Sequence, residues 1–379
     1  MKKLTLLSLS IGSVLFSSHL LAANQVADAR GNAMGNTGVA TADYLVAPFY
    51  NPALAASFKD NDDFGLLLPA FNATARDTDD TLTTIDDLQS AIEKYENSGN
   101  PAGMEDELNG YLNQLSGNKP LTVTAGLGFA IALPTKTIAT NLYGRGYTEI
   151  IAAPNITNDS NVEDRYNQST VDMMAFGYAE FGVAIAKEFT IGEERFSFGV
   201  TPKLQQMTTY AQQASVAEFD LEDYDQSEIT KNAFNVDLGA VWYKNNFRAA
   251  LAIKDVISQE IDAEYKGVKD KYELNTQATL GLAYTAELFT VALDADLTKQ
   301  TRFTKLNDDT QFVRVGVEAN AWGWAQLRAG YEIDLEETLE NSITAGIGIS
   351  PFDVVSLDLA GSYAGDNQFG VSGNLAFTF

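Results

Sequence analysis

The sequence predicts an all-β protein: a bacterial outer-membrane β-barrel of about 14 antiparallel strands, with an N-terminal plug and a helical extracellular insert. After residue 120, segments of about ten residues alternate apolar and polar side chains, which is the period of a half-exposed strand. Beyond the N-terminus, no apolar run reaches the roughly 18 residues that a spanning helix needs. The alternation also continues to Phe379, and an apolar edge strand of this kind is protected only when a barrel closes on it.

The first residues have the pattern of a secretory signal peptide. Lys2 and Lys3 precede an apolar run from Leu4 to Phe16, and Ala22 or Ala23 offers a cleavage point after small residues. This order of charge, apolar run and small residues favours an export signal over a buried N-terminal helix. We therefore expect residues 1–23 to be removed on export.

Composition excludes several classes of chemistry. The chain has no cysteine, and its one histidine, His19, lies within the predicted signal. The mature chain would therefore lack disulfides, Cys or His metal ligands and a His-activated nucleophile. We expect no enzyme activity, no cofactor and no metal, although carboxylate-only chemistry and oxygen-ligated calcium remain open. The net charge of −26 argues against a nucleic-acid partner.

The alternation is clear at residues 234–242, where the apolar face consists of Phe234, Val236, Leu238, Ala240 and Trp242. Equivalent patterns recur at 289–297, 313–321, 325–333 and 355–363. A soluble sandwich would also have one apolar face per strand. Two further features favour a membrane barrel: the polar face carries small residues and charges of both signs, and aromatic residues gather at strand ends. These aromatic residues are Trp242, Tyr243, Trp322 and Trp324.

An even number of strands is expected for a single-chain bacterial barrel. The candidate strands are 64–74, 121–132, 136–151, 171–187, 194–210, 230–243, 246–258, 276–285, 289–299, 310–319, 325–334, 342–350, 354–364 and 369–379. The short connections at 244–246 and 350–353 fit periplasmic turns. The long acidic connections at 152–170, 211–229 and 259–275 fit the outer surface.

Residues 75–119 interrupt the strand pattern with two amphipathic helices joined by a Gly-Pro turn. Apolar side chains recur at helical spacing at Leu82, Ile85, Leu88, Ile92, Tyr95, Met104, Leu108, Tyr111, Leu112 and Leu115. The two helices could pack on each other and cap the barrel. Alternatively, spare apolar surface could form a groove for a hydrophobic ligand. The ligand-binding prediction comprises Leu88, Ile92, Tyr95, Leu108, Tyr111, Leu112 and Leu115.

Residues 24–63, before the first strand, are rich in Gly and Ala and too irregular for a strand or a long helix. Gly31, Gly35 and Gly38 do not form a phosphate loop, because neither a Gly-Lys-Ser/Thr sequence nor a G-x-G-x-x-G after a strand is present. We expect this segment to be a plug inside the barrel. Arg30 then needs a charged partner in the lumen. The candidates are Asp237, Asp294, Asp296, Glu318, Glu332 and Asp358.

Residues 28–56 resemble the N-terminal hatch of the FadL-type (FadL/TodX) outer-membrane superfamily, and the nearest group is the outer-membrane set labelled conjugal transfer protein TraF. The matching positions are Arg30, Gly35, Gly38, Ala42, Asp43, Asn51, Pro52 and Ala53. The resemblance implies a 14-stranded barrel plugged by its N-terminus that takes up hydrophobic molecules, often with sideways release through a wall gap. Gly144, Gly146 and Pro154 could mark a kinked wall strand or strand-end turns. Phe379 resembles the C-terminal signature that the barrel assembly machinery recognises.

The sequence thus predicts a signal at 1–23, a plug at 24–63 and a barrel at 64–379 with the insert at 75–119. One functional interpretation is a barrel in outer-membrane lipid that binds or passes hydrophobic small molecules. Another is a structural barrel of an envelope machine, such as a conjugal transfer apparatus, with its loops as docking surface. An outer-membrane hydrolase is disfavoured, because the mature chain would lack histidine.

Overall fold

The computed structural model describes residues 26–98, 103–219, 227–265, 268–306, 309–321 and 323–379. The predicted signal, the first two residues of the predicted plug and Trp322 lie outside these described residues.

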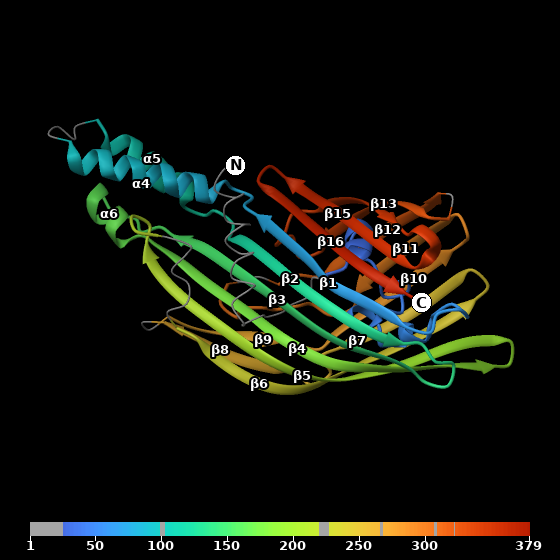
Figure 1. The fold of residues 1–379 in the computed structure, drawn as a ribbon. Helices are drawn as coiled ribbons and strands as arrows, with labels where there is room; N and C mark the ends of the chain where they lie inside the picture. The colour runs from blue at the N-terminus through green and yellow to red at the C-terminus, as the bar shows by residue number, and fades with distance from the viewer. Residues whose placement is uncertain (1–25, 99–102, 220–226, 266–267, 307–308, 322) are drawn as a thin grey trace.

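Fourteen antiparallel strands form one closed barrel, in the order β1-β16-β15-β14-β13-β12-β11-β10-β7-β6-β5-β4-β3-β2 (Figure 1). They are β1 (Gly65–Arg76), β2 (Leu121–Leu133), β3 (Ala139–Asn155), β4 (Thr170–Ile191), β5 (Glu194–Ser215), β6 (Ile229–Lys244), β7 (Phe247–Lys254), β10 (Gln277–Thr285), β11 (Phe289–Asp296), β12 (Phe312–Ala321), β13 (Ala325–Asp334), β14 (Ser342–Ile349), β15 (Val355–Gly365) and β16 (Gln368–Thr378). Each segment predicted as a barrel strand overlaps one of these strands, so the predicted fold is confirmed.

The barrel closes where β16 pairs with β1, from Gly65 opposite Thr378 to Arg76 opposite Gln368. The pairing continues past the strand ends. The backbone N–H of Phe379 donates to the carbonyl of Phe64 at 2.9 Å, and the N–H of Phe64 donates back at 3.0 Å. No strand edge of the barrel is therefore left to face lipid, which could not satisfy it.

Large apolar side chains cover the outside of the barrel. Phe181 is 58% exposed and Leu204 is 65% exposed, and similar side chains lie on β6, β13 and β15. Exposure of this kind would be unfavourable in water but suits the hydrocarbon of a membrane. The alternation seen in the sequence thus separates a lipid face from a lumen face.

The strands differ greatly in length. β4 and β5 have 22 residues each, whereas β7, β11 and β14 have eight. The wall from β2 to β6 therefore extends well beyond the rest of the barrel on the side that carries the helices (Figure 1). We refer to this part as the extended wall.

The long connections contain more secondary structure than predicted. Residues 259–275, expected to be a loop, contain the hairpin β8 (Gln259–Tyr265) and β9 (Val268–Leu274), which is a separate two-stranded sheet. Within 152–170, also expected to be a loop, lies α6 (Val162–Gln168). Asn161 caps α6, because its side-chain oxygen accepts the backbone N–H of Glu163.

The predicted helical insert is present as α4 (Thr81–Asn97) and α5 (Glu105–Leu115). Asp77 accepts the backbone N–H groups of Thr81 and Leu82 at 2.8 and 3.0 Å, which satisfies two free donors of the first turn of α4. None of the described helices is long and apolar enough to cross a membrane.

The wall is irregular in β1 rather than in β3. Gly144, Gly146 and Pro154 all lie inside β3, whose register with β2 and β4 runs without a shift. The idea that these residues mark strand-end turns is therefore wrong, and no break in pairing accompanies them. Instead, the register of β1 shifts between Leu67 and Phe71, around Pro69, which has no N–H to donate to a neighbouring strand.

Candidate functional site in the lumen

Residues 26–56, here called the N-terminal segment, lie inside the barrel (Figure 1). The segment contains α2 (Ala29–Ala33), α3 (Ala47–Tyr50) and the short 3-10 helix η1 (Pro52–Ala56). Its α2 contacts the inner faces of β13 to β16, and η1 contacts β3 to β6 on the opposite side. The segment thus bridges the lumen from wall to wall.

Small residues allow the segment to approach the wall closely. Gly35 has φ +67°, and a Cβ there would lie 2.9 Å from the backbone of Tyr331 and of Val315. On the opposite wall, a Cβ at Gly199 would lie 2.4 Å from the backbone of Pro52. Larger residues at either place would push the segment away from the strands.

Arg30 forms the ion pair expected of it. Its Nε lies 2.9 Å from one oxygen of Glu318, its Nη2 lies 3.0 Å from the other, and its Nη1 donates to the carbonyl of Thr41 at 2.6 Å. Glu318 also pairs with Arg328 at 2.7 Å, and Arg328 pairs with Asp358 at 2.5 Å. Of the six candidate carboxylates, Glu318 is therefore the direct partner, and the others are not paired with Arg30.

The remaining predicted plug positions have structural roles. The backbone N–H groups of Gly38 and Val39 both donate to Asp294 of β11, at 2.8 and 3.0 Å. Asn51 caps η1 by accepting the N–H of Ala53 at 3.1 Å, and Pro52 begins that helix. Asp43 accepts the N–H of Leu45 at 2.9 Å in a local turn.

Asp28, which the sequence reasoning missed, caps α2 by accepting the N–H groups of Arg30 and Gly31 at 3.2 and 2.9 Å. Burial raises the pKa of Asp28, and its hydrogen bond with Gly31 opposes this shift. The signal was present in the sequence, because an Asp before a short helical stretch is a common N-cap.

A partly open chamber with a cavity volume of about 110 Å³ lies between the N-terminal segment and the inner faces of the barrel strands. Its lining carries charges of both signs: Arg76, Lys254, Arg302, Arg314, Glu149, Asp294, Asp296 and Glu332. Many of these charges are already paired. Arg314 lies 2.9 Å from Asp296 and 3.1 Å from Glu332, and Arg302 pairs with Glu149. The chamber is therefore polar and preorganised rather than a purely apolar pocket.

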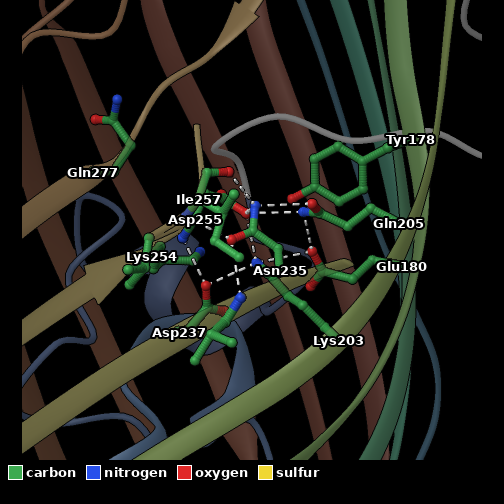
Figure 2. Close-up of polar contacts among 12 residues, drawn as sticks. Tyr178, Glu180, Lys203, Gln205, Asn235, Asp237, Lys254, Asp255, Ile257 and Gln277 are labelled. Atoms are coloured by element: carbon green, nitrogen blue, oxygen red, sulfur yellow. Dashed lines mark hydrogen bonds and ion pairs between the residues drawn. The ribbon is translucent and has the colours of Figure 1, made fainter. Parts of the chain in front are cut away.

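A second group of charges is buried where β4, β5, β6 and β7 meet, and Figure 2 shows it. The ammonium group of Lys203 lies 3.0 Å from Glu180, 2.8 Å from Asp237 and 2.8 Å from Asp255. Lys203, Glu180 and Asp237 have no exposed side-chain surface. Arg145 supplies a second cation, 2.9 Å from Glu180. We call these five residues the buried charge cluster.

Two amides complete the cluster. Gln205 donates to Glu180 and Asp255 at 2.9 and 2.8 Å, and Asn235 donates to Asp255 at 3.2 Å (Figure 2). Neighbouring Lys254 donates instead to the carbonyl of Phe49 in the N-terminal segment at 2.9 Å. Of these residues, the sequence analysis singles out only Asp237, as a candidate partner of Arg30. The sequence shows that charged residues at alternate positions face inward. Which of these side chains come into contact depends on the register of the strands.

The predicted ligand groove on the insert is closed in this structure. Leu88, Leu108, Leu112 and Leu115 have no exposed surface, and Ile92 is 5% exposed. They pack together with apolar residues of the extended wall and of α6. Tyr95 and Tyr111 lie half-buried at the edge of this cluster. The two helices and the wall thus bury the stripe that was expected to face a ligand.

Within the described residues, no group of three or more Asp, Glu, His or Cys side chains is arranged to hold a metal ion. The three carboxylates around Lys203 instead share that ammonium group.

A closed barrel with an apolar outer band and a charged, filled lumen defines an outer-membrane β-barrel protein. A family model described as "F plasmid transfer operon, TraF, protein" matches residues 48–296. Because this match covers more than half of the chain, the protein belongs to that family. None of the curated proteins compared with the chain matches it.

Solved structures of outer-membrane channels share the fold. A Pseudomonas aeruginosa FadL homologue aligns with a TM-score of 0.54 at 11% identity, over 96% of this chain and 99% of that one. The Ralstonia pickettii toluene transporter TbuX aligns at 0.53 and 12% identity, over 93% and 98%. The P. putida toluene transporter TodX aligns at 0.50 and 12% identity, over the same shares. At these identities the likeness concerns the fold, which agrees with the resemblance drawn from residues 28–56.

Proposed function

We propose that this protein is an outer-membrane channel for small molecules, held closed by its N-terminal segment, and that residues 24–63 act as a hatch. The observation that carries the proposal is the position of the segment. It bridges the lumen, is held by Glu318 and Asp294, and supplies Val39, Phe49 and Tyr50 to the chamber lining. Displacing the segment would join the chamber to the periplasmic end of the barrel.

The cargo that fits best is a small amphipathic molecule with a hydrophobic body. Two of the structurally similar proteins, TodX and TbuX, are toluene transporters, which supports a hydrophobic body. The chamber itself carries paired charges, which can exchange partners with a polar head group. Lipid and, during assembly, the barrel assembly machinery acting on Phe379 are the other partners we expect.

Uptake into liposomes tests this function. Purified protein reconstituted into liposomes should admit amphipathic solutes slowly, and a variant lacking residues 24–56 should admit them much faster. If the deletion variant is folded but as impermeable as empty liposomes, the barrel is not a channel.

A second candidate is a structural barrel of a conjugation apparatus, and two observations favour it. The description of the matching family names the F plasmid transfer operon. In addition, α4, α5 and α6 form a closed apolar cluster with the extended wall, which gives a firm outer surface instead of a groove. Impermeability of the deletion variant, together with loss of DNA transfer when the gene is removed, would favour this candidate.

A further inference from the structure

The hairpin β8–β9 covers an apolar surface inside the extended wall. The covered surface consists of Tyr147, Ile151, Met174, Phe176, Tyr178 and Met207, from β3, β4 and β5. The hairpin contributes Ile261, Ala263, Tyr272 and Leu274 to the same cluster, and Phe303 joins from the β11–β12 connection. In water this surface would not stay bare, so the hairpin shields it.

Tyr272 occupies the centre of this contact. Its ring stacks on Phe176, with centroids 3.4 Å apart and planes 7° from parallel. Phe303 also contacts Tyr272 in an edge-to-face arrangement, with centroids 5.1 Å apart. The inner wall therefore has a place shaped for one flat apolar group, and a side chain of the covering hairpin fills it.

Side chains of the wall hydrogen-bond to the backbone of the described hairpin residues. β8 and β9 pair with each other and not with a barrel strand. Hydrogen bonds to the wall include those from Thr209 to the carbonyl of Asp262 at 2.6 Å and from Lys231 to the carbonyl of Glu260 at 2.7 Å. Residues 302–304 bond to β9 and would move with it. We call β8, β9 and residues 302–304 the cover.

The cover leaves the barrel at Asp255, directly after β7. Asp255 has φ +52°, a left-handed conformation that is unfavourable for most side chains. Its carboxylate is held by Lys203, Gln205 and Asn235 of the buried charge cluster and its amides (Figure 2). The cluster therefore fixes the point from which the cover would swing.

The chamber lies next to the cover. Tyr147 belongs to the covered surface and also lines the chamber, and Arg302 of the cover lines it as well. Arg302 pairs there with Glu149 of β3. Moving the cover would expose the apolar surface beneath it, next to the charged lining of the chamber.

We propose that the cover opens outward and that the surface beneath it binds the flat apolar part of an amphipathic molecule, in the place that Tyr272 fills when the cover is closed. The polar part of that molecule meets the charged chamber lining that stays on the barrel wall when Arg302 leaves with the cover, which includes Arg76 and Arg314. This inference rests on the proposed channel function, because it describes the outer step of uptake.

The first test measures opening and binding without transport. Because the chain has no cysteine, Met207→Cys places a single thiol on the covered surface. A charged maleimide should label it slowly, and Tyr272→Ala should speed the labelling at least tenfold. Naphthalene-2-sulfonate should protect the thiol, whereas methanesulfonate, which lacks the ring, should not. Lys269→Cys, on the exposed side of the hairpin, is the control that reacts at the same rate throughout.

The second test locks the cover. Lys231→Cys with Glu260→Cys joins the wall to the hairpin through a short thiol-reactive crosslinker that a reductant cleaves. Crosslinking should abolish uptake of naphthalene-2-sulfonate into proteoliposomes, and cleavage should restore it. Unchanged uptake by crosslinked protein, or equal protection by both sulfonates, would overturn the inference. If the Met207→Cys protein shows selective protection but passes neither sulfonate, binding under the cover stands and the channel function fails.

Discussion

Arg30 in the N-terminal segment and Glu318 on β12 are 288 positions apart in the chain, yet their side chains share two hydrogen bonds inside the barrel. Arg328 binds the same carboxylate from β13 and continues to Asp358 on β15. The segment is thus tied to a row of alternating charges that crosses neighbouring strands. Because the row is shielded from bulk water, losing one member leaves the others poorly compensated.

Replacing Arg30 with Met should loosen the segment. Breaking a shielded ion pair of this kind costs about 3 kcal/mol, so brief openings should become far more frequent. Single-channel recording in planar bilayers would show them as current steps. Arg195→Met is the matched control, because Arg195 pairs with Glu188 at an exposed turn. Equal conductance of both variants would mean that the pair does not hold the segment.

Removing residues 24–56 should open the lumen fully. The barrel strands pair only with one another, so the deletion variant should still form a barrel whose gel mobility changes on boiling. Its ion conductance should be stable and large where the intact protein conducts almost nothing. A folded deletion variant without added conductance would show that other parts of the chain seal the lumen.

Lys203→Met should destabilise the whole barrel. The change leaves Glu180, Asp237 and Asp255 close together without their shared cation, at a cost of about 3–5 kcal/mol. The temperature at which the folded band disappears on a detergent gel should fall clearly. Lys244→Met removes an exposed lysine paired with Glu194 and should leave that temperature nearly unchanged.

Leu112→Ser should disrupt the helical insert rather than a binding surface. Leu112 has no exposed surface, so the loss of packing and the buried hydroxyl together cost about 3 kcal/mol or more. Protease should then cut within residues 75–119 while the barrel keeps its heat-dependent mobility. Glu107→Ser, on the exposed side of α5, should resist protease like the parent. Loss of hydrophobic-probe binding without protease sensitivity would instead support the groove interpretation.

Location can be tested directly. The apolar belt should keep the folded protein in the outer-membrane fraction, and unboiled protein should migrate differently from boiled protein on a detergent gel. Recovery of native protein from the soluble periplasm would contradict the barrel's place in the membrane.

The sequence by itself determined the barrel, because which face a side chain takes on a strand depends on its position along the chain. The alternation at residues 234–242 or 355–363 is visible in the sequence without knowledge of the neighbouring strands. The role of Arg30 was also predictable, since a guanidinium inside a lumen requires a carboxylate. Which of six carboxylates it meets depended on strand register, and the structure selected Glu318.

Only the tertiary structure decided what the apolar stripes and buried charges face. Leu112 and Tyr272 both lie on amphipathic elements, and the sequence pattern shows that such a face is buried without showing against what. Leu112 is buried against α4, α6 and the extended wall. Tyr272 is buried against Phe176 of the same wall. Lys203 and Asp255 come together for the same reason: contacts between distant strands depend on how the barrel closes, and no local pattern encodes that closure.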